Sequence, residues 1–376
     1  MNWWSYFLIR NRSCVGLACF GFAAVSLAVR GHAAETLDLM AGWARVDITP
    51  DMKSGKKPVL AGLMVPRFTD TVDHPVMLTA LALDGRKDGK VAEQAVFISC
   101  DIGVGTHNQW RGESLLEELR RRLKGRLPGL DERKVVTMCT HTHNSPSFME
   151  GQYKLPDENW VLRPAEYREF LLARLEQVVE QAWGRREPAA MTWALGHAVV
   201  GYNRRVVYAD GQAVLGGWRR DPAFEFIEGG SDYGVKALFF WNPRGELTGV
   251  LVNVACPSQV QIQESVISAD FWGDVREQLR RQPGFEHAFV LPMLAAAGDQ
   301  WPYQQIRDKA EAAMRERRGF DLTGELGRRI VREVVDLLPL SRGDRRSRVD
   351  FRHVVRTLPM PLRVISAEEA KRIDEE

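Results

Sequence analysis

The stretch Val135-Val-Thr-Met-Cys-Thr-His-Thr-His-Asn-Ser-Pro146 joins an apolar run to two histidines and a turn signal. The run Val135–Cys139 predicts a buried strand. Side chains two residues apart in an extended strand point to the same face, so His141 and His143 are expected to leave the sheet edge side by side. Imidazole nitrogens placed in this way can converge on one metal ion, or on an ion and its substrate. The alternative is a pair of ordinary loop-edge histidines that bond backbone groups.

The composition indicates a globular protein with a substantial core. The chain has 376 residues, of which 45% are apolar. Its 51 basic residues nearly balance 49 acidic ones, so the charge predicts no nucleic-acid partner. No internal repeat and no break in composition is evident. We therefore expect one large domain over residues 41–366, followed by a charged tail or the start of a linker over residues 367–376.

Residues 1–33 are typical of a secretory signal peptide. Met1–Arg12 carries two arginines and no acid, Ser13–Val29 is a small and apolar run, and Gly31 and Ala33 are the small residues that cleavage requires. We predict cleavage near Ala33 and a secreted or periplasmic location. The alternative is a retained membrane anchor, because a run of about 17 residues is at the lower limit for spanning a bilayer.

Three cysteines remain after cleavage, at positions 100, 139 and 256. An odd number cannot form a complete set of disulfides, and each cysteine lies in an apolar, strand-like run. We expect buried, small hydrophobic side chains.

The periodicity of apolar residues predicts an α/β fold with a mixed sheet or sandwich core flanked by helices. Strands alternate with helices in one half, and residues 235–255 form a hairpin, so the sheet cannot be purely parallel. The expected strands are 43–49, 76–84, 94–100, 135–139, 191–200, 235–241, 247–255, 288–294 and 348–356. The expected helices are 109–123, 164–183, one capped by Ser268 and Asp270, and 324–338.

Polar or reactive side chains follow several of these strands, where open α/β sheets place their sites. They are Asp101, His141 with His143, Asn203 with Arg204, Cys256 with Gln259, and Asp299. The sequence has no phosphate loop, no dinucleotide fingerprint and no Gly-x-Ser-x-Gly elbow, and metal-assisted hydrolysis is the class that remains. Arg204 suits a carboxylate product or a developing oxyanion, although a structural salt bridge is an equal alternative.

A series of short blocks resembles the neutral/alkaline ceramidase family. In order, the blocks are Gly42–Pro50, Val96–Gly103 with Asp101, Thr140–Pro146, Asn203-Arg204, Ile267–Asp270 and Ala297–Asp299. Their order and spacing extend over most of residues 41–302. The His-Thr-His block carries most of the resemblance.

The resemblance implies a zinc-dependent amidohydrolase that cleaves the amide of an N-acylsphingosine. It assigns His141 to the zinc ion and His143 to the substrate or product beside it. Arg204 would contact the product carboxylate, Asn203 would bind the substrate with it, and Asp101 and Asp299 would support the site. The partner is then a lipid or other small amide, with association to a membrane surface through that substrate. The sequence does not indicate an oligomeric state.

Two features depart from the family pattern. The family's second zinc histidine ends a strand before a Pro or Gly, whereas this chain has Cys256-Pro257. A thiolate can bind zinc, so Cys256 replaces the imidazole in one interpretation and is an inert core residue in the other. The family's glutamate and tyrosine ligands lie beyond the Gly-Asp block, in a segment that this chain does not reach. The resemblance therefore describes a divergent and truncated member.

Two alternatives to a zinc amidohydrolase remain open. One is a catalytically silent relative that binds a lipid or a glycan, with structural histidines. The other is a metal hydrolase of a different amide or ester.

Overall fold

The computed structural model describes residues 36–375 apart from 107–113, 218, 360 and 362. The predicted signal peptide lies outside the described residues. Among the helices that are described, none is long and apolar enough to cross a membrane.

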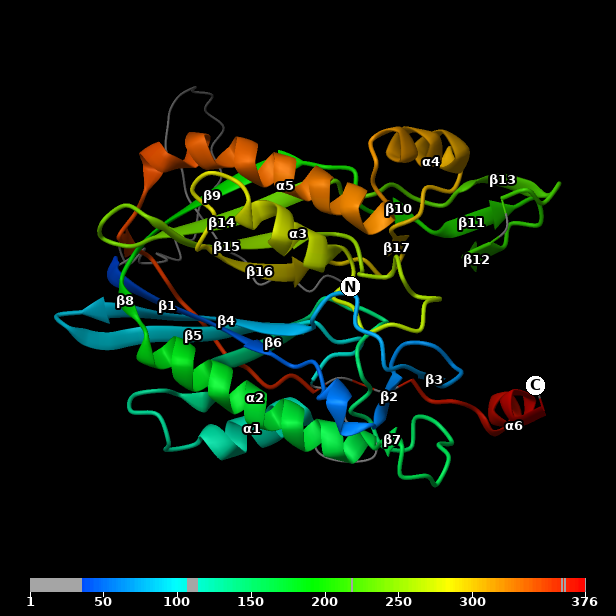
Figure 1. Ribbon diagram of the computed structural model, residues 1–376, viewed down its shortest axis with the longest axis horizontal. Coiled ribbons are helices and arrows are strands. Elements are labelled where there is room, and N and C mark those ends of the chain that lie inside the picture. Colours follow the sequence, from blue (N-terminus) through cyan, green and yellow to red (C-terminus); the bar gives the residue numbers. More distant parts are fainter. Residues whose placement is uncertain (1–35, 107–113, 218, 360, 362, 376) are drawn as a thin grey trace, which may run out of the picture. The chain divides into compact units, whose positions relative to one another are not determined.

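Two mixed sheets form the centre of the fold (Figure 1). The first has the order β18 (Arg348–Val349), β1 (Leu37–Asp47), β4 (Met77–Lys87), β5 (Lys90–Cys100) and β6 (Val135–Cys139), and β8 (Glu187–Pro188) also pairs with β1. The second has the order β16 (Phe289–Leu294), β15 (Leu247–Val254), β14 (Gly234–Trp241) and β9 (Ala190–His197). In these two sheets β5 is parallel to β6 and β15 is parallel to β16, and the other pairs are antiparallel.

Helices cover the outer face of each sheet, so the domain has four layers (Figure 1). Helices α1 (Leu115–Leu123) and α2 (Pro164–Gly184) pack on the first sheet, and α3 (Phe271–Arg280) and α5 (Leu322–Ser341) pack on the second. Between the sheets, Trp43 stacks on Phe289 with ring centroids 5.8 Å apart and meets Phe240 edge-on at 5.5 Å. Gly249 admits this indole, because a Cβ there would lie 2.6 Å from it. The predicted α/β class with a mixed-sheet core is confirmed.

The chain follows the same path twice, which the sequence did not reveal. The second half repeats the first in order, direction and layer. Elements β9, β14, β15, α3, β16 and α5 correspond in turn to β1, β4, β5, α1, β6 and α2. In both halves a hairpin is followed by a crossover helix and a parallel strand, as right-handed βαβ packing allows. Equivalent strand exits of the two halves therefore carry the polar residues that the sequence singled out.

Smaller elements surround one end of this sandwich. They are β2 (Lys57–Leu60) with β3 (Arg67–Phe68) and β7 (Val161–Leu162), β10 (Tyr202–Asn203) with β17 (Gln300–Trp301), and the sheet of β11 (Arg205–Tyr208), β12 (Ala213–Leu215) and β13 (Phe224–Ile227). Helices α4 (Asp308–Arg317) and α6 (Ala367–Glu375) and the 3-10 turns Met52–Ser54, Glu132–Lys134 and Arg342–Asp344 complete the description.

Several predicted boundaries need correction. The expected strand 348–356 contains only the two residues of β18, and the charged tail forms helix α6. Asp270, not Ser268, caps α3 by accepting the N–H of Phe271, while the Ser268 hydroxyl binds the N–H of Asp270. Part of the expected helix 109–123 lies outside the described residues.

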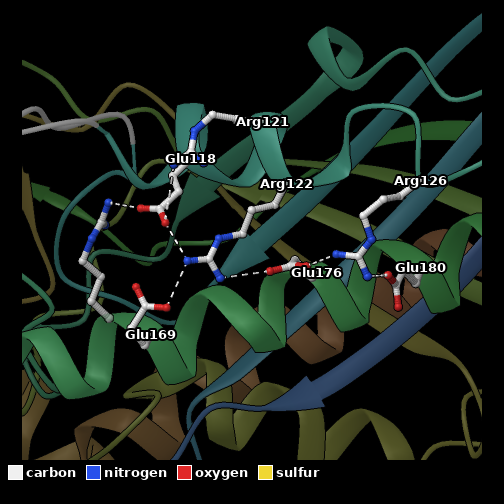
Figure 2. Close-up of polar contacts among 8 residues, drawn as sticks. Glu118, Arg121, Arg122, Arg126, Glu169, Glu176 and Glu180 are labelled. Atoms are coloured by element: carbon white, nitrogen blue, oxygen red, sulfur yellow. Dashed lines mark hydrogen bonds and ion pairs between the residues drawn. The ribbon is translucent and has the colours of Figure 1, made fainter.

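A ladder of ion pairs connects α1 and the turn after it to α2 (Figure 2). Arg122 contacts Glu118 at 2.6 Å, Glu169 at 3.0 Å and Glu176 at 3.3 Å. Arg126 contacts Glu176 and lies 2.6 Å from Glu180. These partly exposed pairs fix the orientation of α1 but contribute little free energy each, so the buried leucines of α1 supply most of the docking energy.

A buried ion pair joins the exit of β5 to helix α3. Both oxygens of Asp101 bind Arg276, at 2.6 and 3.0 Å, and one also accepts the N–H of Met77 at 3.0 Å. Asp101 is fully buried and Arg276 is 7% exposed. The pair therefore links the two halves of the domain beneath their strand exits.

Removing one partner of this pair should destabilise the protein strongly. Arg276→Met leaves the Asp101 carboxylate buried without its cation, and we expect a loss of about 3–5 kcal/mol in the free energy of unfolding. Arg281→Met, at the end of the same helix, removes only an exposed contact with Glu277 and should cost less than about 1 kcal/mol. Urea unfolding of both variants measures the difference, and equal losses would contradict a structural role for the pair.

Candidate functional site

The site lies where the exits of β6 and β15 meet. The histidine loop (residues 140–146) follows β6, and the Gln259 loop (residues 255–270) follows β15. The N–H of Ser258 donates to the carbonyl of Thr140 at 3.1 Å, and the Thr142 hydroxyl donates to the carbonyl of Ser268 at 2.8 Å. A third bond runs from the N–H of Ser268 to the carbonyl of Asn144 at 3.0 Å. Backbone bonds therefore hold the two loops in fixed register.

His141 and His143 lie side by side in this loop. Their Nε2 atoms are 3.3 Å apart, and the ring planes cross at 80° with centroids 4.8 Å apart. Alternation along a strand does not explain why the two rings lie together, because β6 ends at Cys139 and His141 has a left-handed backbone with φ of 63°. A non-glycine residue in this conformation is strained, and such strain is common at functional sites.

Gly62 and Arg67 hold His143 from the other side. Gly62 has φ of 99°, and a Cβ at this position would lie 2.3 Å from Cγ of His143. The guanidinium of Arg67 donates to the carbonyls of His143 at 2.6 Å and Ala61 at 3.2 Å. Neither Gly62 nor Arg67 stands out in the sequence, because the contacts connect segments far apart along the chain.

Both imidazoles are neutral near pH 7. Burial lowers the pKa of His143 to about 4, and the nearby His141, Arg67 and Arg204 add to the effect. Burial also lowers the pKa of His141, against a hydrogen bond to the backbone of Gly103 that raises it. Neutral imidazole is the form that binds metal ions and accepts protons.

The tautomer of His143 depends on its contact with Gln259. Nδ1 is buried and has no partner among the described residues, whereas Nε2 is 2.9 Å from the side-chain amide of Gln259. Nδ1 lacks a partner in either tautomer, so the direction of the Gln259 contact decides which nitrogen carries the proton. With the amide nitrogen facing the ring, Gln259 donates to Nε2 and the proton is on Nδ1; with the amide turned, the Nε2–H donates to the amide oxygen.

Asn203 and Arg204 follow the exit of β9 and are held by the exit of β16. The Asn203 amide donates to the Asp299 carboxylate at 2.9 Å, and the Arg204 N–H donates to the Asp299 carbonyl at 2.8 Å. One guanidinium N–H of Arg204 donates to the carbonyl of Gly298 at 2.8 Å. Within the described part of the chain no carboxylate lies within ion-pair distance of Arg204. Its charge is therefore available to an anion.

Cys256 and Asp101 face the interior. The Cys256 thiol is 1% exposed and packs among Val200, Phe271 and Trp272. Burial raises its pKa well above the ordinary value. Among the described residues, no group of three or more His, Cys, Asp or Glu side chains is placed to hold a metal ion. The structure thus brings together His141, His143, Gln259 and Arg204, but not Cys256. Zinc binding by Cys256 stays a prediction. Asp101 binds Arg276, which suits a supporting role.

Comparison with known proteins gives a likeness in fold. No family model and no curated protein sequence matches this chain. The solved neutral ceramidase from Pseudomonas aeruginosa superposes with a TM-score of 0.58 and 18% identity, over 81% of this chain and 45% of that one. A structure described as a ceramidase complexed with C2 gives 0.58 and 16%, over 81% and 44%. The chain has a ceramidase-like fold. It spans less than half the length of these two ceramidases.

Adding a methyl group at Gly62 should displace His143. In Gly62→Ala the new Cβ overlaps the ring, and we expect a loss of about 1–3 kcal/mol beyond the cost of the left-handed backbone. Gly55→Ala is the matched control, because Gly55 has φ of 76° and nothing within 4 Å of its Cβ position. Urea unfolding and the ring NMR signals of His143 measure the effect. Equal stability and unchanged ring signals in the two variants would show that Gly62 does not support the ring.

The pKa of His143 also predicts a dependence of stability on pH. The unfolded imidazole binds a proton near its usual pKa of about 6.5, whereas the folded one does so only near pH 4. The stabilisation that the neutral His143 ring gives to the folded state is fully present above about pH 6.5 and is lost as the pH falls toward about 4. In metal-free protein, the unfolding free energy of His143→Gln should therefore fall less over this window than that of the wild type. Parallel curves would contradict the lowered pKa.

Proposed function

We propose that this protein is an exported, zinc-dependent hydrolase of the ceramidase type that cleaves an N-acyl amide. The observation that carries the proposal is the pair of neutral imidazoles with Nε2 atoms 3.3 Å apart beside the unpaired guanidinium of Arg204. The ceramidase-like fold supports the same class of reaction.

His141 is the residue that fits zinc. Its imidazole is neutral, is partly exposed, and lies at the surface between the two loops. Bound zinc would supply a Lewis acid and make water nucleophilic near neutral pH. The donor set is incomplete, because the described residues hold no third ligand-type side chain near the two histidines. In the proposal Cys256 is a further ligand only if it leaves the apolar cluster that surrounds it.

His143 would act on the substrate. In the proposal its proton is on Nε2, and this N–H donates to the acyl oxygen, where negative charge develops, once the substrate takes the place of the Gln259 amide. Without substrate the Gln259 amide lies 2.9 Å from Nε2, and Gly62 closes the opposite side of the ring.

Arg204 would bind the carboxylate end of the acyl group. Burial lowers the pKa of Arg204, but a guanidinium keeps its charge at any physiological pH. Its Nε is buried without a partner among the described residues, so a bidentate carboxylate would satisfy it. Asn203 and Asp299 fix the backbone that carries this arginine.

The substrate in this proposal is a lipid amide, met at a membrane surface outside the cytoplasm. A catalytically silent relative that binds a lipid or glycan is the second candidate. The observation that favours it is the lack of a three-ligand metal group in the described part of the chain.

Zinc content and hydrolysis together test the proposal. We expect the purified protein to bind zinc and to hydrolyse a fluorogenic N-acyl amide. We expect His141→Ala to lose its bound zinc and to hydrolyse the amide at least about 100-fold more slowly. His287→Ala, at an exposed position outside the site, is the matched control and should keep both.

A substrate panel separates the remaining alternatives. Turnover of N-acyl lipids over amino-acid amides and simple esters supports a ceramidase-like substrate, and the reverse order indicates a different one. Zinc content that does not change in His141→Ala, or lipid binding without turnover of any substrate, would overturn the proposal that this protein is a zinc hydrolase.

A further inference from the structure

A cavity of about 690 Å³ lies at the opposite end of the second sheet from the histidines. It is bordered by the turn between β14 and β15, by the start of β9 and by the segment after α5. Strand β15 runs from this turn to the Gln259 loop, and its eight residues separate the cavity from the site by about 25 Å. In Figure 1, β8 marks this end of the sheets and β10 and β17 mark the other. The cavity is thus independent of the proposed active site.

Arginines gather around this cavity without matching carboxylates. Arg244, Arg342 and Arg345 line it, and Arg185 lines an adjoining cavity of about 190 Å³. Among the described residues, neither Arg185 nor Arg342 nor Arg345 has a carboxylate within ion-pair distance. Arg244 is paired with Glu246, and Glu187 is the one acid that lines either cavity. The local charge is therefore positive.

Two buried tryptophans lie beside the cavities. Trp241 lines both cavities, and the guanidinium of Arg345 lies 6.0 Å from its ring centroid. Trp43 lines the smaller cavity and is 5% exposed. The guanidinium of Arg345 therefore has an aromatic ring beside it and no carboxylate partner among the described residues.

We propose that this arginine-lined cavity binds a small molecule that carries a phosphate or sulfate group. Two guanidiniums without a carboxylate partner among the described residues, those of Arg342 and Arg345, line this cavity, and that of Arg185 lines the adjoining one. The oxygens of one phosphate or sulfate group can accept hydrogen bonds from more than one guanidinium at once. The volume is in the range of small-molecule sites. The phosphate can belong to a soluble metabolite or to a lipid headgroup, and the chemistry of recognition is the same.

Calorimetric titration with pyrophosphate in a low-salt buffer tests the proposal on the whole chain. We expect saturable, salt-sensitive binding to the wild type and at least about tenfold weaker binding to the double variant Arg342→Gln/Arg345→Gln. Arg332→Gln is the matched control, because Arg332 is an exposed arginine of α5 that lines neither cavity, and it should bind as the wild type does. Circular dichroism and the melting temperature establish that each variant is folded.

A vesicle arm separates the two sources of phosphate. Cosedimentation with phosphatidylcholine vesicles containing phosphatidate, lost in the double variant and absent with phosphatidylcholine alone, supports a lipid headgroup. Pyrophosphate binding without vesicle binding supports a soluble ligand. Binding of either probe that is equal in the wild type and the double variant shows only nonspecific attraction to the surface, and overturns the proposal. Lack of binding to both probes does the same.

Discussion

The hydrogen bond from the Ser258 N–H to the Thr140 carbonyl, 3.1 Å long, joins strand exits that belong to different sheets. It is possible only because the two sheets pack face to face with the exits of β6 and β15 at one end. The bonds of Thr142 and Asn144 to Ser268 extend the same connection. The contact between His143 and Gln259 depends on this register, because the two residues lie 116 positions apart in the chain. The site is therefore a property of sheet packing, not of the histidine block alone.

The doubled path of the chain explains how the polar residues divide their tasks. In the first half the exits of β5 and β6 carry Asp101 and the two histidines, and in the second half the exits of β15 and β16 carry Cys256 and Asp299. The exits of β5 and β15 support the fold through the buried side chains of Asp101 and Cys256. The exit of β6 positions the two imidazoles, and the exit of β16 positions Arg204 through Asp299. Two copies of one architecture thus supply different chemistry at a shared end.

Local pattern was enough to predict many elements of this fold. Strand β6 has the predicted bounds, and α2 extends the predicted helix by one residue, because apolar periodicity and a proline at the first helical position are local signals. The doubled path was not visible, because equal topology requires only similar apolar patterns and not similar residues. Gly62 and Arg67 were missed because their role arises from contact with His143, about 80 positions away. The buried state of Cys256 likewise depends on helix α3, which covers it.

The most direct test of the account is the protonation state of His143. Long-range ¹H–¹⁵N NMR of the histidine rings distinguishes the two neutral tautomers from the imidazolium. At pH 7 we predict a neutral ring with its proton on Nε2, as the proposed role toward the substrate requires, and the same tautomer after addition of zinc while the signals of His141 shift. A proton on Nδ1, a charged ring, or zinc-induced shifts at His143 Nε2 without any at His141 would contradict it.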